Sequence, residues 1–319
     1  MDRRQWLGVA LAAASACGYG SGPLFAKSVY GAGIDWLALL FWRFLIGGAL
    51  VWAWTLLFRD NRAALRALPR RRALALLCLG AFFVGNASTY YAALQYVSAS
   101  LAALIVYIYP ALVAVLSIRW GHGLHGRRPW AALAIVTLGV VLTIGGIQTE
   151  ADPVGLVLIV ASPIIYSAYI ILAARLAGER RGETADSRTG TGAETRPAVA
   201  SALMITGTFA VVAVLAVAAG APVLPGQVPG DAWFGLLGIA TFSTALAISA
   251  FYAATARIGA AQTALVSTVE PVWTIALAML LFDERLGPLQ LAGGVLVIGG
   301  VILAQTTPGA TPDVVVEEA

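Results

Sequence analysis

Residues Gln262 to Phe282 read QTALVSTVEPVWTIALAMLLF, an apolar run about 20 residues long, enough to cross a bilayer as one helix. The run contains one carboxylate, Glu270, which is followed directly by Pro271. An ionised group at the centre of a bilayer costs several kcal/mol, so such a residue normally faces protein, water or a partner charge. Pro271 has no amide hydrogen to donate to the carbonyl of Ser267, which frees that carbonyl for another partner and bends the helix. The stretch therefore predicts a membrane helix with a polar break at mid-membrane depth.

The composition of the whole chain is that of a membrane protein. Of its 319 residues, 60% are hydrophobic and 11% are charged, with a mean hydropathy of +0.84, whereas soluble domains are roughly 25% charged. Long uninterrupted apolar runs favour helices over a barrel, whose strands alternate in character. We therefore predict an all-α membrane protein with ten transmembrane helices. The predicted helices span residues 6–26, 34–58, 73–93, 99–118, 129–147, 154–176, 198–219, 232–256, 262–282 and 288–305.

The charges between these helices predict the orientation of the chain. If the N-terminus is cytoplasmic, nearly all arginines fall in cytoplasmic loops, and the outer side keeps only Lys27 and Arg285. This asymmetry predicts a multi-pass protein of the cell (inner) membrane with both termini cytoplasmic. Because the charges lie between spans, the net charge of +4 does not indicate a nucleic-acid partner. Residues 178–197 are predicted to form a cytoplasmic linker and 306–319 a disordered tail.

The sequence contains a weak internal repeat. A shift of 161 residues places Pro110 on Pro271 and Tyr91 on Tyr252, and a shift of 147 places Tyr19 on Tyr166. The predicted units are residues 1–147 and 148–305, each with five helices. An odd number of helices requires the second unit to be inverted, an arrangement typical of secondary transporters with a mid-membrane site built from broken helices. The alternative is that apolar composition alone produces these matches.

Five short motifs carry a resemblance to a known family. They are residues 19–27 (YGSGPLFAK), 41–44 (FWRF), 109–110 (YP), 270–271 (EP) and 282–286 (FDERL). With them the chain resembles the EamA-type transporters of the drug/metabolite transporter superfamily. The resemblance implies ten helices in two inverted five-helix repeats. This chain departs from the family pattern at Tyr19, where members often have tryptophan, and in its long linker, so no member's substrate is carried over.

Two charged residues within predicted spans are candidates for the site. Arg43 either pairs with Glu270 or binds a substrate carboxylate with two parallel hydrogen bonds. Glu270 either tunes the site by protonation, with protons as coupling ion, or is a structural carboxylate bonded to a neighbouring helix. Aromatic, hydroxyl and amide side chains near these charges suit an amphipathic solute, although many of them will pack instead. The predicted substrate-binding residues are Arg43, Glu270, Tyr19, Asn86, Tyr90, Tyr107, Tyr109, Tyr166, Ser267 and Trp273, with helix breaks at Pro110 and Pro271.

The sequence gives little support for enzymatic chemistry. His122 and His125 lie in a short glycine-rich loop without a third metal ligand, and no phosphate-binding glycine loop is present, so we predict no enzyme activity, metal or cofactor. The prediction is a secondary transporter, an exporter of small organic metabolites such as amino acids, that works by alternating access within the lipid bilayer. The alternatives are a nucleotide-sugar or other phosphorylated-solute carrier, which needs more cations, and a lipid flippase, which needs a lateral opening.

Overall fold

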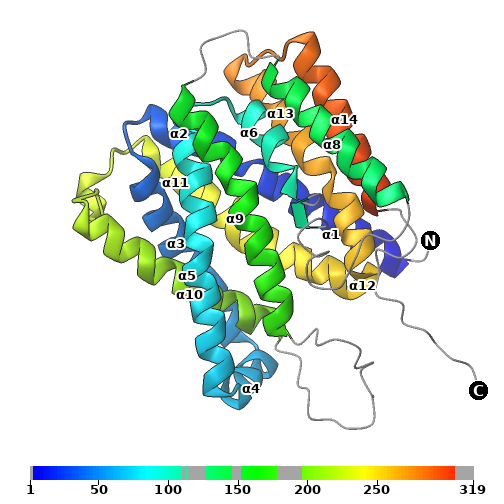
Figure 1. Ribbon diagram of the computed structural model, residues 1–319. Helices are drawn as coiled ribbons and strands as arrows, with labels where there is room; N and C mark the ends of the chain where they lie inside the picture. The colour runs from blue at the N-terminus through cyan, green and yellow to red at the C-terminus, as the bar shows by residue number, and fades with distance from the viewer. Residues whose placement is uncertain (1–2, 110–111, 114–126, 146–151, 178–195, 306–319) are drawn as a thin grey trace, which may run out of the picture.

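The computed structural model describes residues 3–109, 112–113, 127–145, 152–177 and 196–305 (Figure 1). All regular secondary structure in these ranges is helical. Six helical stretches are long and apolar enough to cross a membrane, and three shorter apolar helices accompany them. The chain is thus a multi-pass, all-helical protein in its described parts. Pro110, His122 and His125, the linker up to residue 195 and the tail 306–319 lie outside the described residues.

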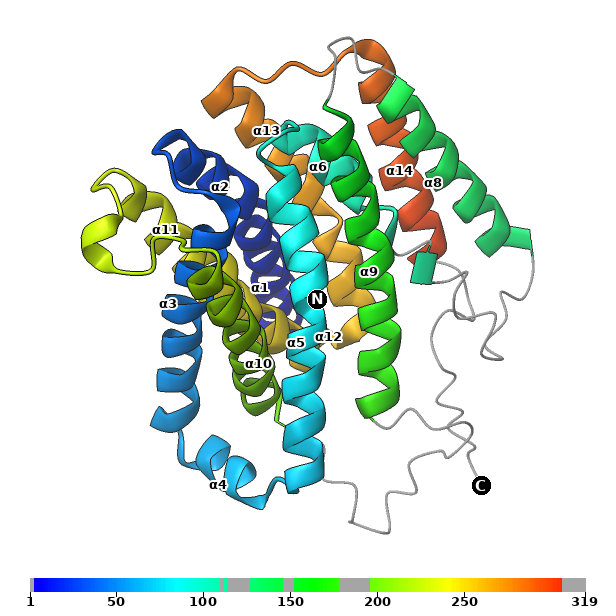
Figure 2. The same cartoon turned by 60° about the vertical axis from the view of Figure 1, so that its left-hand side comes forward.

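The helices of the first part overlap the predicted runs, with two exceptions described below. The helix boundaries are α1 Arg3–Gly20, α2 Gly22–Gly31, α3 Trp36–Leu57, α4 Arg59–Ala67, α5 Arg70–Ala93, α6 Ala99–Val106 and α8 Arg127–Gly145. The short helix α4 was not predicted, because its charged sequence RDNRAALRA lacks the length and hydropathy of a span. It follows α3 directly at one end of the bundle (Figure 2).

The second part contains a longer continuous helical run. Its elements are α9 Pro153–Ala177, α10 Pro197–Ala218, the 3-10 turn η1 Pro225–Gln227, α11 Ala232–Ala240, the π-helical segment η2 Thr241–Leu246, α12 Ala247–Ser267, α13 Val269–Phe282 and α14 Pro288–Gln305. The predicted break at residues 257–261 is wrong, because α12 continues through it. That stretch is rich in alanine, a strong helix former, and contains no proline. The interruption lies at Thr268 instead, three residues before Pro271.

The first membrane span also contains an interruption that was not predicted. The run Arg4–Gly31 is long enough for one span, but α1 ends at Gly20 and α2 begins at Gly22. Pro23 lies in the first turn of α2, where its missing amide hydrogen is tolerated, but it cannot continue the hydrogen bonding of α1. We call residues Gly20–Gly22 the first break and residues Ser267–Pro271 the second break.

Small residues allow the helices to pack closely. On α1, the small residues Ala12 and Ala16 are buried, and the helix lies against α12 and α13. The closest crossing joins α5 and α10. A methyl group added at Gly80 would overlap the carbonyl of Met204, and one added at Gly207 would overlap the carbonyl of Leu77. Small residues are the usual means by which membrane helices approach one another.

Replacing Gly80 with alanine is expected to destabilise the protein by about 1–3 kcal/mol, because the new methyl group forces α5 and α10 apart. The measurement is the thermal unfolding of purified protein in detergent. Gly299→Ala is the matched control, since nothing lies within 4 Å of a methyl group added at that helical position. Equal melting temperatures for the two variants would contradict the close crossing.

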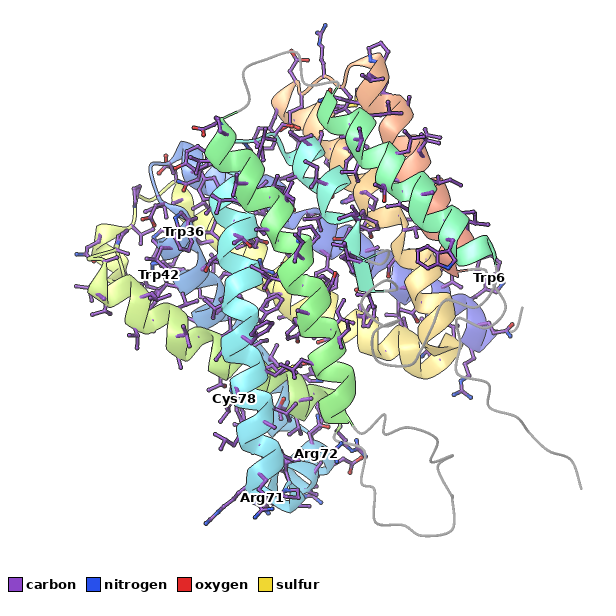
Figure 3. All side chains as sticks on the ribbon, in the orientation of Figure 1. Trp6, Trp36, Trp42, Arg71, Arg72 and Cys78 are labelled. Carbon is purple, nitrogen blue, oxygen red and sulfur yellow. The ribbon has the colours of Figure 1, made fainter. Side chains whose placement is uncertain are left out.

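The two ends of the bundle differ in charge. Arg71 and Arg72 mark one end, beside α4 (Figure 3), and the ion pair between Arg196 and Asp60 lies there too. We call this the arginine-rich end. At the opposite end, the α13–α14 loop with Glu284 contacts the start of α6.

Candidate functional site

The second break joins the two parts of the chain. Because Pro271 cannot donate to the Ser267 carbonyl, that oxygen accepts a hydrogen bond from the Tyr107 hydroxyl, at 2.7 Å. This confirms that the proline frees the carbonyl for another partner. The same hydroxyl lies 3.2 Å from Oε2 of Glu270, a half-buried side chain in the first turn of α13. Tyr107 comes directly after α6, so a residue of the first predicted unit completes the break in the second.

The geometry around Tyr107 makes the hydrogen bonding depend on the protonation of Glu270. A tyrosine hydroxyl has one hydrogen to donate but lies within reach of two acceptors here. When Glu270 is protonated, it can donate to the Tyr107 oxygen while Tyr107 donates to Ser267, and both bonds form. When Glu270 is ionised, its carboxylate competes with the Ser267 carbonyl for the same hydrogen. The arrangement can therefore couple a proton to the geometry of the break.

Aromatic side chains extend from Tyr107 towards α9. The ring of Tyr109 lies 6.0 Å from that of Tyr107 and 4.9 Å from that of Tyr166. Ser167, the next residue on α9, lies 3.2 Å from the Tyr109 carbonyl. Asn86 is held nearby, where its side-chain oxygen accepts from the Ser162 hydroxyl at 2.9 Å. Five predicted site residues, namely Tyr107, Tyr109, Tyr166, Ser267 and Glu270, thus form one connected group, which we call the acid group.

Arg43 lies in a second group built on the π-helical segment η2. Its Nε donates to the hydroxyl of Thr244 at 2.9 Å, and one terminal nitrogen lies 3.5 Å from the Ser243 carbonyl. The guanidinium stacks over the ring of Tyr91 at 4.8 Å from the centroid, and Tyr90 packs edge-on against Tyr91 at 5.1 Å. Single-turn π-helical segments are frequent at functional sites because they redirect side chains and carbonyl groups. We call Arg43, Tyr90, Tyr91, Ser243 and Thr244 the arginine group.

The first break lies between these two groups. On the acid side, Thr274 donates to the Gly20 carbonyl at 2.8 Å, and Trp273 Nε1 donates to the Ser21 hydroxyl at 3.0 Å. On the arginine side, the Ser243 hydroxyl lies 3.5 Å from the Tyr19 carbonyl. Because Pro23 leaves that carbonyl without its helical donor, the break offers polar backbone groups in mid-span. Residues from α1, α13 and the π-helical segment thus meet here.

Arg43 and Glu270 do not pair in this structure. Among the described ranges, the ion pairs are Arg196 with Asp60 and Arg285 with Asp283, both well exposed. The predicted Arg43–Glu270 pair is therefore absent from this conformation. Arg43 instead has neutral hydroxyl, carbonyl and aromatic partners.

Sequence reasoning missed several residues that build these groups. Ser21 stands between two glycines and before a proline, a signal for an interruption that the apolar run conceals. Ser243 and Thr244 belong to the cluster TFST within an otherwise apolar stretch, and that cluster becomes the π-helical segment. Tyr91 was noted only as a repeat position. Clusters of hydroxyl residues within a predicted span were thus the sequence feature that could have identified these site residues.

A separate contact lies at the end of the bundle opposite the arginine-rich end. The Glu284 carboxylate accepts hydrogen bonds from the backbone amides of Ala99 at 2.9 Å and Ser100 at 3.0 Å, at the start of α6. A carboxylate at a helix N-terminus satisfies free amides and interacts favourably with the helix dipole. Beside it, Lys27 Nζ donates to the Val97 carbonyl at 2.7 Å. We call Lys27, Val97, Ala99, Ser100 and Glu284 the end contact.

Comparison with known proteins agrees with this architecture. A family model described as the EamA-like transporter family matches residues 6–145 and 189–306. A solved structure titled "Crystal structure of protein" has 18% sequence identity and a TM-score of 0.62, covering 93% of this chain and 96% of its own. At that identity the likeness supports the fold alone. No curated protein matches the chain. Because the family model covers most of the sequence, this multi-pass membrane protein belongs to the EamA-like transporter family.

Proposed function

We propose that the protein is a secondary transporter that exports small organic metabolites with a carboxylate, such as amino acids, by alternating access between two inverted five-helix units. The observation that carries the proposal is the bond from Tyr107 to the Ser267 carbonyl beside Glu270. It supports the proposal because a titratable group and a freed backbone carbonyl both lie beside Tyr107, a residue of the first predicted unit. Broken helices at such an interface are the usual construction of a transporter site.

In this proposal the arginine group and the acid group have different roles. Arg43, oriented by Thr244 and stacked on Tyr91, binds the substrate carboxylate. The rings of Tyr107, Tyr109 and Tyr166 contact its apolar part. Glu270 exchanges a proton during the cycle. The hydrogen bond from Tyr107 to the Ser267 carbonyl is strong when Glu270 is protonated and weaker when Glu270 is ionised, because the carboxylate then competes for the same hydrogen. A proton enters as a solute leaves.

The test is transport by purified protein in liposomes loaded with radiolabelled amino acids. Export that saturates with substrate and accelerates when the external solution is acidified supports the proposal. Movement of a fluorescent phospholipid between the two leaflets, measured in the same vesicles, distinguishes a lipid flippase from a solute carrier. A nucleotide-sugar panel covers phosphorylated solutes, which the single arginine of the site disfavours because phosphates need more positive charge.

The end contact is expected to act as a latch in this cycle. Replacing Glu284 with alanine removes two charge-assisted hydrogen bonds to the start of α6, each worth about 1.5–3 kcal/mol, and should populate a state open at that end. A cysteine introduced at the fully buried Ser100, after replacement of Cys17 and Cys78 by serine, reports the opening. Its labelling by a polar maleimide should accelerate about tenfold or more.

The matched control for the latch is Asp283→Asn. Asp283 is exposed and adjoins Glu284, and asparagine tolerates its left-handed backbone, with φ of 51°. Labelling of the Ser100→Cys reporter should stay at the unmodified rate in this variant. If Glu284→Ala leaves the labelling rate unchanged, the contact does not hold this end closed.

A further inference from the structure

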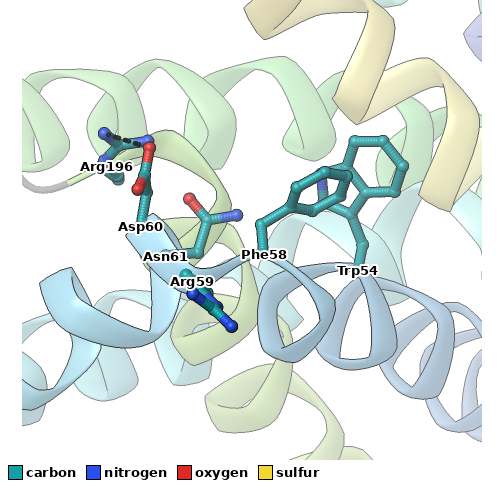
Figure 4. A pocket seen from close by; sticks show the side chains of 6 residues that line it. All are labelled: Trp54, Phe58, Arg59, Asp60, Asn61 and Arg196. Carbon is teal, nitrogen blue, oxygen red and sulfur yellow. Dashed lines mark hydrogen bonds and ion pairs between the residues drawn. The ribbon is translucent and has the colours of Figure 1, made fainter.

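A pocket of about 310 Å³ lies at the arginine-rich end, away from the acid and arginine groups. Its walls come from the end of α3, the start of α4 and the residue before α10 (Figure 4). The lining residues are Trp54, Phe58, Arg59, Asp60, Asn61 and Arg196. The pocket therefore combines cations, an amide and aromatic rings where α3 ends and the chain turns into a charged helix.

The charges of the pocket favour an anion. Arg59 and Arg196 supply two cations, and Asp60 offsets one of them through its 3.2 Å pair with Arg196. Both partners of that pair are well exposed, at 50% and 73% of their side-chain surface, and exposed ion pairs contribute little free energy. Arg196 can therefore exchange Asp60 for another anion at low cost. Arg59 has no ion pair or hydrogen bond within the described ranges.

Asn61 supplies a neutral polar group to the same pocket. The residue as a whole is 8% exposed, lines the pocket and has no side-chain hydrogen bond in the part of the chain that the structure describes. An amide both donates and accepts hydrogen bonds, so Asn61 can bind an oxygen of a ligand whose anion lies at the arginines. The adjacent start of α4 also lacks a side-chain cap at Phe58, and free amides at a helix N-terminus favour an anion.

The apolar side of the pocket indicates what carries the anion. Trp54 is 50% exposed, Phe58 43% and the neighbouring Leu57 71%. The rings of Trp54 and Phe58 pack with their centroids 4.5 Å apart. These side chains end a membrane-spanning helix, so they lie where hydrocarbon meets the polar headgroup region. A ligand that fits both sides has an anionic head joined to apolar chains.

We propose that this pocket binds an anionic phospholipid, with its phosphate at Arg59 and Arg196, a glycerol or ester oxygen at Asn61, and acyl chains along Trp54 and Leu57. Basic pockets at the ends of membrane helices are suited to such headgroups. The site is separate from the transported solute, so the proposal does not depend on the function proposed above. Its consequence is that stability depends on the lipid composition of the membrane.

The test uses full-length protein purified in a neutral detergent. Dioleoylphosphatidylglycerol, dioleoylphosphatidylcholine and inorganic phosphate are added separately, and the melting temperature is followed against concentration. Phosphatidylglycerol is expected to raise the melting temperature, and the other two are not. Arg59→Gln and Arg196→Gln should each weaken the apparent affinity for phosphatidylglycerol about fivefold, because each arginine near an anionic headgroup contributes on the order of 1 kcal/mol.

Arg66→Gln is the matched control, since Arg66 is exposed on the same helix but does not line the pocket. Equal losses for Arg66→Gln and Arg59→Gln would overturn the proposal in favour of general surface attraction. Stabilisation by phosphatidylcholine or by phosphate alone, at the same concentrations, would also overturn it. Native mass spectrometry provides a second readout: Arg59→Gln, which loses no described contact, should retain less phosphatidylglycerol than wild type at an unchanged melting temperature without lipid.

Discussion

Replacing Glu270 with glutamine is expected to remove the pH dependence of transport. Glutamine has nearly the same shape as glutamate and can still donate to the Tyr107 oxygen, but it does not titrate within the physiological pH range. In wild type, acidifying the external solution should accelerate export because proton entry drives solute exit. In Glu270→Gln the ratio of export rates at acidic and neutral external pH should fall to about one, since a group that binds no proton contributes no linkage. The measurement is efflux from liposomes over an external pH series.

The control for Glu270→Gln is Asp283→Asn, which also converts a carboxylate to an amide but lies at the exposed end of α13. Its pH profile should match that of wild type. Counterflow exchange, which needs no net proton movement, should continue in Glu270→Gln and show that the variant is folded. If Glu270→Gln keeps the wild-type pH profile, Glu270 is not the group that couples protons to transport.

The second large effect is expected for Arg43→Lys. Lysine keeps the positive charge but loses the planar fork, the Nε bond to Thr244 and the stacking on Tyr91. If Arg43 binds the substrate carboxylate, a charge-assisted bond worth about 1.5–3 kcal/mol is lost, which corresponds to a fall in apparent affinity of roughly 10- to 150-fold. The measurement is the substrate concentration for half-maximal export.

A structural role of Arg43 would give a different result. Substrate analogues without a carboxylate should be exported equally by wild type and Arg43→Lys if the arginine binds that group. Equal losses for both kinds of substrate, together with a lower melting temperature, would show that Arg43 only holds the π-helical segment. Arg285→Lys, at an exposed position, is the control for the exchange of arginine and lysine.

The membrane class, most helix positions and the family resemblance could be predicted from the sequence. Apolar runs of sufficient length fix these features, because a bilayer accepts only segments that satisfy their own backbone hydrogen bonds. The break near Pro271 and the freed Ser267 carbonyl also followed from one residue, since proline lacks an amide hydrogen. Helix α4 and the interruption at Ser21 could not be predicted in this way. Each depends on the charge or the glycine content of only a few residues, which a long hydropathy pattern does not register.

The sequence by itself determined an all-helical membrane protein with a carboxylate and a guanidinium in its spans. Only the tertiary structure decided their partners: Glu270 meets Tyr107, whereas Arg43 meets Thr244 and Tyr91. The physical reason is that a charged side chain within a span bonds to whichever polar groups the packed helices bring within about 3 Å. Those neighbours are more than 100 positions away in the chain, except Tyr91, so no local pattern specifies them.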